Sequence, residues 1–152
     1  MEMTAKRPQV LNFINGDFKK SSVKMLPIYS PIDGSVISSL PDSTTNEVAQ
    51  AVSAAKQAYS AWSSKTLKER VQYFFRYRSL LESHREELAQ LIRLENGKTI
   101  DEARAEVDKS IELCEFAVSM PQVIVNEIQE VSQGVECRIE RKPLGVVACI
   151  TV

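Results

Sequence analysis

Apolar and polar residues alternate over short stretches near the start of the chain, and this pattern predicts small β-hairpins between residues 11 and 40. The dipeptides Asn15-Gly16 and Asp33-Gly34 separate the apolar stretches. Both favour tight hairpin turns, because the two central positions of such turns need positive φ. We therefore expect one or two antiparallel hairpins, with extended segments at residues 13–14, 28–29 and 36–37.

From residue 43 the apolar spacing becomes helical, and four capping-box patterns predict the starts of four helices. In each pattern a hydroxyl side chain stands three residues before a glutamate, so that both can accept hydrogen bonds from unpaired backbone N–H groups. The pairs are Thr44 with Glu47, Thr66 with Glu69, Ser83 with Glu86, and Thr99 with Glu102. Gly97 predicts the end of the third helix, and Pro121 predicts that the fourth cannot continue.

Each predicted helix has an apolar face, which indicates packing against another layer. The fourth has the most regular spacing, with apolar residues three or four apart: Ile100, Ala103, Val107, Ile111, Cys114 and Val118. In the second helix the aromatic residues 73–77 could suggest base stacking, but their place on a capped helix favours core packing. Arg78 lies among the apolar residues of that face and must extend its charged end to the surface.

After Pro121 the pattern becomes extended again, and residues 123–141 alternate around Gln133-Gly134. This predicts an antiparallel hairpin with one apolar face, which needs a packing partner because an isolated hairpin is marginally stable. A turn at residues 143–145 then leads into residues 146–150, an unbroken apolar run typical of a strand buried on both faces of a parallel sheet. Nothing after Val152 supplies the required crossover, so we expect a truncated part of a larger domain.

The composition narrows the classes of partner. With 19 basic and 20 acidic residues the net charge is −1, so the sequence indicates no nucleic-acid or anionic-membrane surface. No stretch is apolar enough to span a bilayer, and residues 1–7 do not lead into a secretory signal, so the cytoplasm is the expected location. Three cysteines and one histidine without a pairing motif make a zinc site or a disulfide framework improbable.

The residues capable of chemistry have simpler structural interpretations. Residues 95–98 combine a carboxylate, an amide and an amine, yet Gly97 makes this segment a helix end. Cys149 in an apolar strand, like Cys114 on a helix face, is expected to pack rather than react. His84 opens a helix within a charged stretch and is expected on the surface. The sequence also has no glycine-rich phosphate loop and no nucleophile elbow, so we predict no catalytic and no metal-binding residue.

Taken in order and spacing, several segments resemble the N-terminal third of NAD(P)-dependent aldehyde dehydrogenases. The matching segments are Phe13-Ile14-Asn15-Gly16-Asp17-Phe18, Tyr29-Ser30-Pro31-Ile32-Asp33-Gly34, the alanine-rich helix ending at Trp62, Leu94-Glu95-Asn96-Gly97-Lys98-Thr99, and Pro143-Leu144-Gly145-Val146-Val147. Residues 94–117 look like the methylmalonate-semialdehyde dehydrogenase branch, although other semialdehyde dehydrogenases are similar in this region.

The resemblance implies an α/β fold, the N-terminal part of the cofactor-binding domain of that family. Residues 1–122 would supply its N-terminal hairpins and helices, residues 123–142 an oligomerisation hairpin, and residues 143–152 the first core strand of its sheet. The resemblance also implies that the backbone at Ile150 and Thr151 binds the cofactor NAD. Val152 stands where proline is usual, and the family's oxyanion-stabilising asparagine is absent.

The family chemistry uses a cysteine nucleophile that forms a thioester with a small aldehyde substrate, and in this branch coenzyme A releases the acyl group. No cysteine of this chain stands in the matching motif, so the chain by itself is expected to be inactive. An oligomer formed through residues 123–141 is the implied partner. An interaction module that joins full-length subunits through the same hairpin is the alternative, and a nucleotide-binding pseudo-enzyme is a third.

Overall fold

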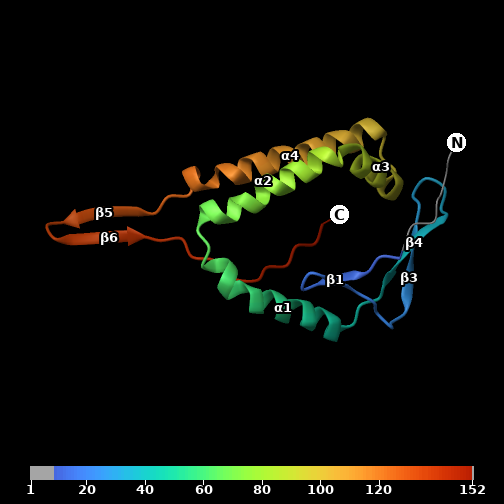
Figure 1. The fold of residues 1–152 in the computed structure, drawn as a ribbon, viewed down its shortest axis with the longest axis horizontal. Helices are drawn as coiled ribbons and strands as arrows, with labels where there is room; N and C mark the ends of the chain where they lie inside the picture. The colour runs from blue at the N-terminus through green and yellow to red at the C-terminus, as the bar shows by residue number, and fades with distance from the viewer. Residues whose placement is uncertain (1–8, 152) are drawn as a thin grey trace.

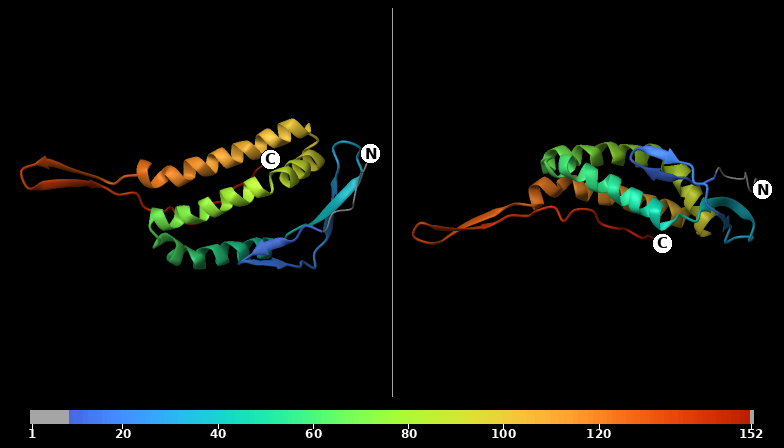
Figure 2. Two further views of the ribbon diagram at one scale, coloured as in Figure 1. Left: turned by 45° about the horizontal axis from the view of Figure 1, so that its top comes forward. Right: turned by 90° about the horizontal axis from the view of Figure 1, so that it is seen from below.

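The computed structural model describes residues 9–151 and has the expected α/β composition, with four helices and three two-stranded antiparallel sheets among those residues (Figure 1). Helices α2, α3 and α4 lie together, α1 precedes them and is not part of that group, and the last hairpin projects from one end (Figures 1 and 2). The elements in chain order are β1 Asn12–Ile14, β2 Asp17–Lys19, β3 Met25–Tyr29, β4 Val36–Pro41, α1 Thr45–Ser63, α2 Leu67–Ser83, α3 Arg85–Asn96, α4 Ile100–Val123, β5 Glu127–Ser132 and β6 Val135–Ile139.

The prediction of one or two N-terminal hairpins is confirmed, and the structure has two of them within residues 9–41. β1 pairs with β2 across Asn15 and Gly16, whose φ values of 55° and 84° are both positive, as the tightest hairpin turn requires. β3 pairs with β4 over a longer connection that contains Asp33 and Gly34. In that connection the Asp33 carboxylate accepts hydrogen bonds from the backbone N–H and the hydroxyl of Ser35, at 3.0 and 2.7 Å.

Three of the four predicted capping boxes are present, at Thr44, Thr66 and Thr99. The prediction for Ser83 and Glu86 is wrong. Ser83 is still the last residue of α2, and its hydroxyl donates to the Leu80 carbonyl, so α3 follows His84 without a side-chain cap. An N-cap residue must leave helical geometry, and two helices this close in sequence leave Ser83 no room to do so.

The predicted end of α3 is confirmed, whereas the predicted end of α4 is wrong. Gly97 ends α3 in the left-handed conformation, with φ of 79°. Helix α4 instead includes Pro121 and ends at Val123, and the N–H of Ile124 still donates to the Met120 carbonyl at 2.8 Å. Proline removes its own N–H from the helical ladder, and this helix continues for only two residues beyond it.

The core lies where α2 and α3 pack against α4. Ala89 of α3 and Ala103 of α4 are completely buried, and Val107 is 3% exposed. Such small side chains let two helix backbones approach closely. Along α4 the predicted apolar face is confirmed, because Cys114 is buried as well. Arg78 of α2 extends from that interface to Glu115 of α4, with Nη2 2.6 Å from the carboxylate, as its amphipathic shape predicts.

Other apolar faces have no covering layer among the residues that the structure describes. Helix α1 has no buried residue. The expectation that the aromatic residues of α2 pack in a core is wrong for this chain: Tyr73, Phe74, Phe75 and Tyr77 are all exposed. Trp62 of α1 meets Tyr73 edge to face, with ring centroids 5.1 Å apart. An apolar face at helical spacing shows that a covering layer would stabilise the helix, but no described residue supplies that layer over these rings.

The predicted hairpin of residues 123–141 is confirmed as β5 and β6, but its single apolar face is not. Directly paired residues of an antiparallel ladder share a face, and Ile128 is paired with Arg138 rather than Ile139. An irregularity between Glu130 and Ser132 adds one residue to β5 and shifts the pairing by one position. Val135, Cys137 and Ile139 therefore share one face of the hairpin, and Ile128 lies on the other.

Candidate functional site

The predicted cofactor contacts lie in a segment without regular structure. Residues 140–151 form neither helix nor strand, Ile150 is 95% exposed, and Thr151 is exposed too. The core strand expected at residues 146–150 is therefore not formed. A parallel strand exists only when it is hydrogen bonded to a neighbour, and the sheets among residues 9–151 are all antiparallel hairpins. The role of Ile150 and Thr151 in binding NAD stays a prediction.

The start of this segment is held in place. The Tyr59 hydroxyl of α1 donates to the Pro143 carbonyl at 3.1 Å. The Arg141 N–H donates to Asn126 Oδ1 at 3.4 Å, and the Arg141 guanidinium donates to the Val125 carbonyl. These bonds fix the segment at the junction of α1, α2 and the hairpin. Beyond Pro143 the described residues form no helix or strand and are exposed, and this stretch includes both expected cofactor-binding positions.

The structure brings no catalytic constellation together in the part of the chain that it describes. Cys114 is buried in the helical core as predicted, but Cys137 and Cys149 are exposed. The expectation that Cys149 packs in a strand fails because that strand is not formed. His84 is a surface residue, as predicted, with Nδ1 2.9 Å from the Glu87 carboxylate. Among residues 9–151 no group of three His, Cys, Asp or Glu side chains could hold a metal ion.

The structural interpretation of residues 95–98 is confirmed at Gly97 and Lys98. Gly97 ends α3, and a Cβ atom there would lie 3.1 Å from Pro31 Cγ, in the connection between β3 and β4. Lys98 pairs with the Glu106 carboxylate one to two turns into α4. This segment therefore closes the turn between α3 and α4 and fits against the N-terminal hairpins.

Charged side chains connect α3 and α4 across the outer surface of their interface. The Arg104 guanidinium donates to Glu86 Oε2 at 2.9 Å, and this hydrogen bond is the main reason why the pKa of Glu86 is lowered. Arg85 holds Asp108 in the same way. Perturbed carboxylates often mark active sites, but these two are held in ion pairs between the surfaces of α3 and α4, which accounts for their lowered pKa values. We therefore assign them a role in helix packing.

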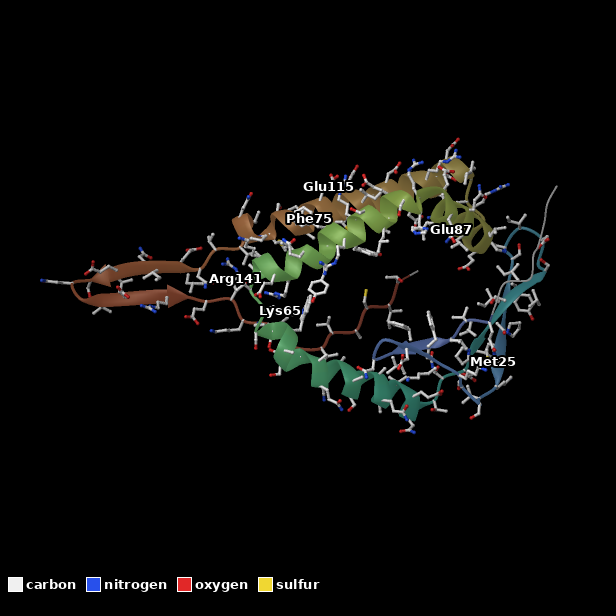
Figure 3. All side chains as sticks on the ribbon, in the orientation of Figure 1. Met25, Lys65, Phe75, Glu87, Glu115 and Arg141 are labelled. Carbon is white, nitrogen blue, oxygen red and sulfur yellow. The ribbon has the colours of Figure 1, made fainter. Side chains whose placement is uncertain are left out.

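Sequence reasoning missed one cluster, which lies at the junction of α1 and α2. Lys65, Arg70, Arg141 and Lys142 line a single pocket of about 390 Å³ there. Figure 3 shows Lys65 and Arg141 at this junction, on segments far apart in the sequence. The charge pattern of the sequence treats these residues as separate short basic stretches, and only the path of the chain after β6 brings them together.

No helix of the described chain is long and apolar enough to cross a membrane.

Comparison with known proteins establishes the family. Residues 18–152 match the aldehyde dehydrogenase family, so the chain belongs to that family. The chain is 41% identical over 147 residues to malonate-semialdehyde dehydrogenase 2 of Bacillus cereus, a match that covers 95% of the chain and 30% of that protein. It is 38% identical over 154 residues to malonate-semialdehyde dehydrogenase of Lacticaseibacillus casei, covering 99% of the chain and 31% of that protein.

Solved structures agree. Methylmalonate-semialdehyde dehydrogenase of Oceanimonas doudoroffii has a TM-score of 0.80 and 30% identity, covering 88% of this chain and 27% of that chain. A putative methylmalonate-semialdehyde dehydrogenase of Sinorhizobium meliloti, solved in complex with NAD, has a TM-score of 0.77 and 28% identity. The match covers 90% of this chain and 28% of that chain. The predicted resemblance to the family and to its methylmalonate-semialdehyde branch is thereby confirmed. The chain spans about 30% of the length of the curated relatives, and it corresponds to their N-terminal portion.

Proposed function

We propose that this chain is the N-terminal part of an NAD-dependent dehydrogenase that oxidises malonate or methylmalonate semialdehyde to an acyl-CoA. The observation that carries the proposal is the 41% identity to a malonate-semialdehyde dehydrogenase along 95% of the chain. Support for NAD comes from the similar Sinorhizobium meliloti structure, which is complexed with it. Coenzyme A rests on the resemblance to the methylmalonate-semialdehyde branch.

The described residues would supply one side of the cofactor site and none of the reacting groups. NAD, when bound in the whole protein, would accept the hydride that leaves the substrate. The exposed backbone at Ile150 and Thr151 is free to lie against such a group, but no other described residue encloses it. The chain alone is therefore proposed to have no dehydrogenase activity, because the nucleophile and the acyl acceptor site would belong to other parts of the protein.

The nucleotide sequence downstream of codon 152, read in all three frames, tests this proposal first. A frame that continues with a Pro-Phe-Asn motif and later a cysteine nucleophile supports it, and the assembled protein should then reduce NAD in the presence of malonate semialdehyde and coenzyme A. The 152-residue chain assayed alone is the control and should form no NADH. Dehydrogenase activity in the chain alone would contradict the proposed division of roles.

A second proposal concerns association, and the projection of the β5–β6 hairpin favours it. The hairpin projects from the helices (Figure 1). Every residue of its two strands is exposed, including Ile128, Val135 and Ile139. A hairpin with unpaired outer edges and apolar side chains can add to another sheet or pack on a neighbouring subunit. We infer that the hairpin joins this chain to full-length dehydrogenase subunits or to a second copy of the chain.

Co-purification with a tagged full-length malonate-semialdehyde dehydrogenase tests this association. Combined Val135→Ser and Ile139→Ser substitutions should abolish it, since both side chains share one face. The matched control, Glu136→Gln with Arg138→Gln, changes the same strand on the opposite face and should retain it. A chain that stays monomeric beside the full-length enzyme would rule out association through the hairpin.

The cytoplasmic location also remains a prediction, which cell fractionation can check.

A further inference from the structure

The pocket at the junction of α1 and α2 gathers positive charge from three separate parts of the chain. Lys65 comes from the connection between the helices, Arg70 from the first turns of α2, and Arg141 with Lys142 from the segment that leaves β6. The pocket, which we call the junction pocket, has a volume of about 390 Å³. That volume falls within the range of small-molecule sites, roughly 300 to 1,000 Å³.

Two of the four cations, Arg70 and Arg141, form no ion pair with any carboxylate among residues 9–151. Lys142 is paired with the Glu140 carboxylate at 2.6 Å. The Glu69 carboxylate, which caps α2 through Thr66, is close enough to Lys65 for the lysine charge to help lower the pKa of Glu69. Like charges held in one pocket repel each other, so this arrangement favours an anion that neutralises them.

Arg70 supplies an independent observation. Its Nε atom is buried and has no hydrogen-bond partner among the described residues. A buried N–H of a charged group that lacks an acceptor costs free energy, and native structures rarely leave such groups unsatisfied. Arg70 lines the junction pocket, and because its Nε atom is itself closed off from solvent, an anion there would meet the guanidinium through its Nη atoms and lie next to the unpaired Nε–H. The Arg141 guanidinium uses one nitrogen for the Val125 carbonyl and keeps its remaining donors.

We propose that the junction pocket binds a phosphate group through Arg70, Arg141 and Lys65. A phosphate dianion offers more acceptor oxygens than a carboxylate and therefore matches donors that approach from three segments. Binding would hold residues 141–143 against the start of α2, and so would fix the direction in which the chain leaves the hairpin. This proposal does not depend on the dehydrogenase function proposed above.

Nuclear magnetic resonance of the 152-residue chain tests the proposal through the Arg70 Nε–H signal. Inorganic phosphate is titrated at constant ionic strength, set with chloride, so that general screening does not change. We expect a saturable shift of this signal and of the backbone signals of residues 65–70 and 141–143. Adenosine 5′-monophosphate forms a second arm: tighter binding than phosphate assigns the site to a nucleotide phosphate, and equal binding assigns it to free phosphate.

Substitutions distinguish specific phosphate binding in the junction pocket from non-specific attraction to positive charge. Arg70→Gln should raise the dissociation constant of phosphate about tenfold or more, as expected for the loss of a charge-assisted hydrogen bond. Lys68→Gln is the matched control, because Lys68 is exposed on the same turn of α2 and does not line the pocket. If Arg70→Gln disturbs folding, Arg141→Gln in the exposed segment serves instead. A shift that never saturates, or an equal loss with Lys68→Gln, overturns the proposal.

Discussion

Arg85 on α3 donates two hydrogen bonds to Asp108 on α4, from Nε to Oδ1 at 2.6 Å and from Nη2 to Oδ2 at 2.7 Å. This paired geometry matches the planar guanidinium to the carboxylate and sets the rotation of α3 relative to α4. The two hydrogen bonds lie beside the buried contact of Ala89 with Ala103. They lower the pKa of Asp108 below its ordinary value of 3.8, mainly through the side-chain bond from Arg85.

The Arg85–Asp108 pair predicts a loss of stability at low pH. A carboxyl group whose pKa is lower in the folded state stabilises that state fully above its unfolded pKa, here 3.8. The contribution disappears as the pH falls through the lower, folded pKa. Helix content followed by circular dichroism between pH 6 and about pH 2 should therefore fall in this range. Asp108→Asn should reduce the fall, whereas Asp42→Asn, outside the helical layer, should leave it in place.

Truncation of the helical core should destabilise the chain far more than truncation of its surface. Val107→Ala removes two buried methyl groups from the α3–α4 interface and should cost roughly 2 kcal/mol of unfolding free energy. Leu113→Ala on the same helix changes a side chain that is 60% exposed and should cost far less. Amide hydrogen exchange in α3 and α4 measures both effects. Equal losses of protection would show that this interface is not the core.

Of two similar sequence patterns, Thr99 with Glu102 caps a helix and Ser83 with Glu86 does not. Substitution of the hydroxyl residue should therefore destabilise the chain only at Thr99. Thr99 accepts the N–H of Glu102 at the start of α4, so Thr99→Ala should cost about 1 kcal/mol. Ser83 stands in the same pattern with Glu86 but bonds back to Leu80, so Ser83→Ala should be nearly neutral. Urea unfolding followed by helix content compares the two. A similar loss at both positions would contradict the assigned start of α3.

Gly97 is restricted in two ways, by its backbone conformation and by a close neighbour, whereas Gly134 is restricted only by its backbone conformation. Both residues have positive φ, at 79° and 74°, so alanine is strained at either position. At Gly97 a Cβ atom would also lie 3.1 Å from Pro31 Cγ, whereas no atom lies within 4 Å at Gly134. Gly97→Ala should therefore lower the midpoint of thermal unfolding more than Gly134→Ala does. If the two variants behave alike, the contact between the α3–α4 turn and the N-terminal hairpins is unimportant.

The features that could be predicted from the sequence are those that neighbouring residues determine. Asn15-Gly16 needs only its own turn geometry, Thr99 needs only Glu102, and Gly97 needs only the end of its helix. The predictions that failed depended on contacts with residues far away in the sequence. The strand at residues 146–150 and the burial of Phe75 both require a covering layer, and a periodic pattern shows that a face is apolar without showing what lies on it.

The same distinction applies to the candidate sites. Family resemblance placed the expected cofactor contact at Ile150 and Thr151, which the structure leaves exposed in a segment without helix or strand. The junction pocket could not be predicted, because Arg70 and Arg141 meet only after the chain has passed through α2, α3, α4 and the last hairpin. No local rule relates two residues so far apart.

The pairing of each strand with its immediate neighbour has a consequence for synthesis on the ribosome. Each of the three sheets among the described residues joins consecutive strands, and α2, α3 and α4 follow one another directly. Translation adds about 5 to 20 residues per second, whereas helices and hairpins form within microseconds. Each unit can therefore begin to form as soon as it leaves the exit tunnel. In a growing chain these marginal units would form and open locally until later residues cover and stabilise them.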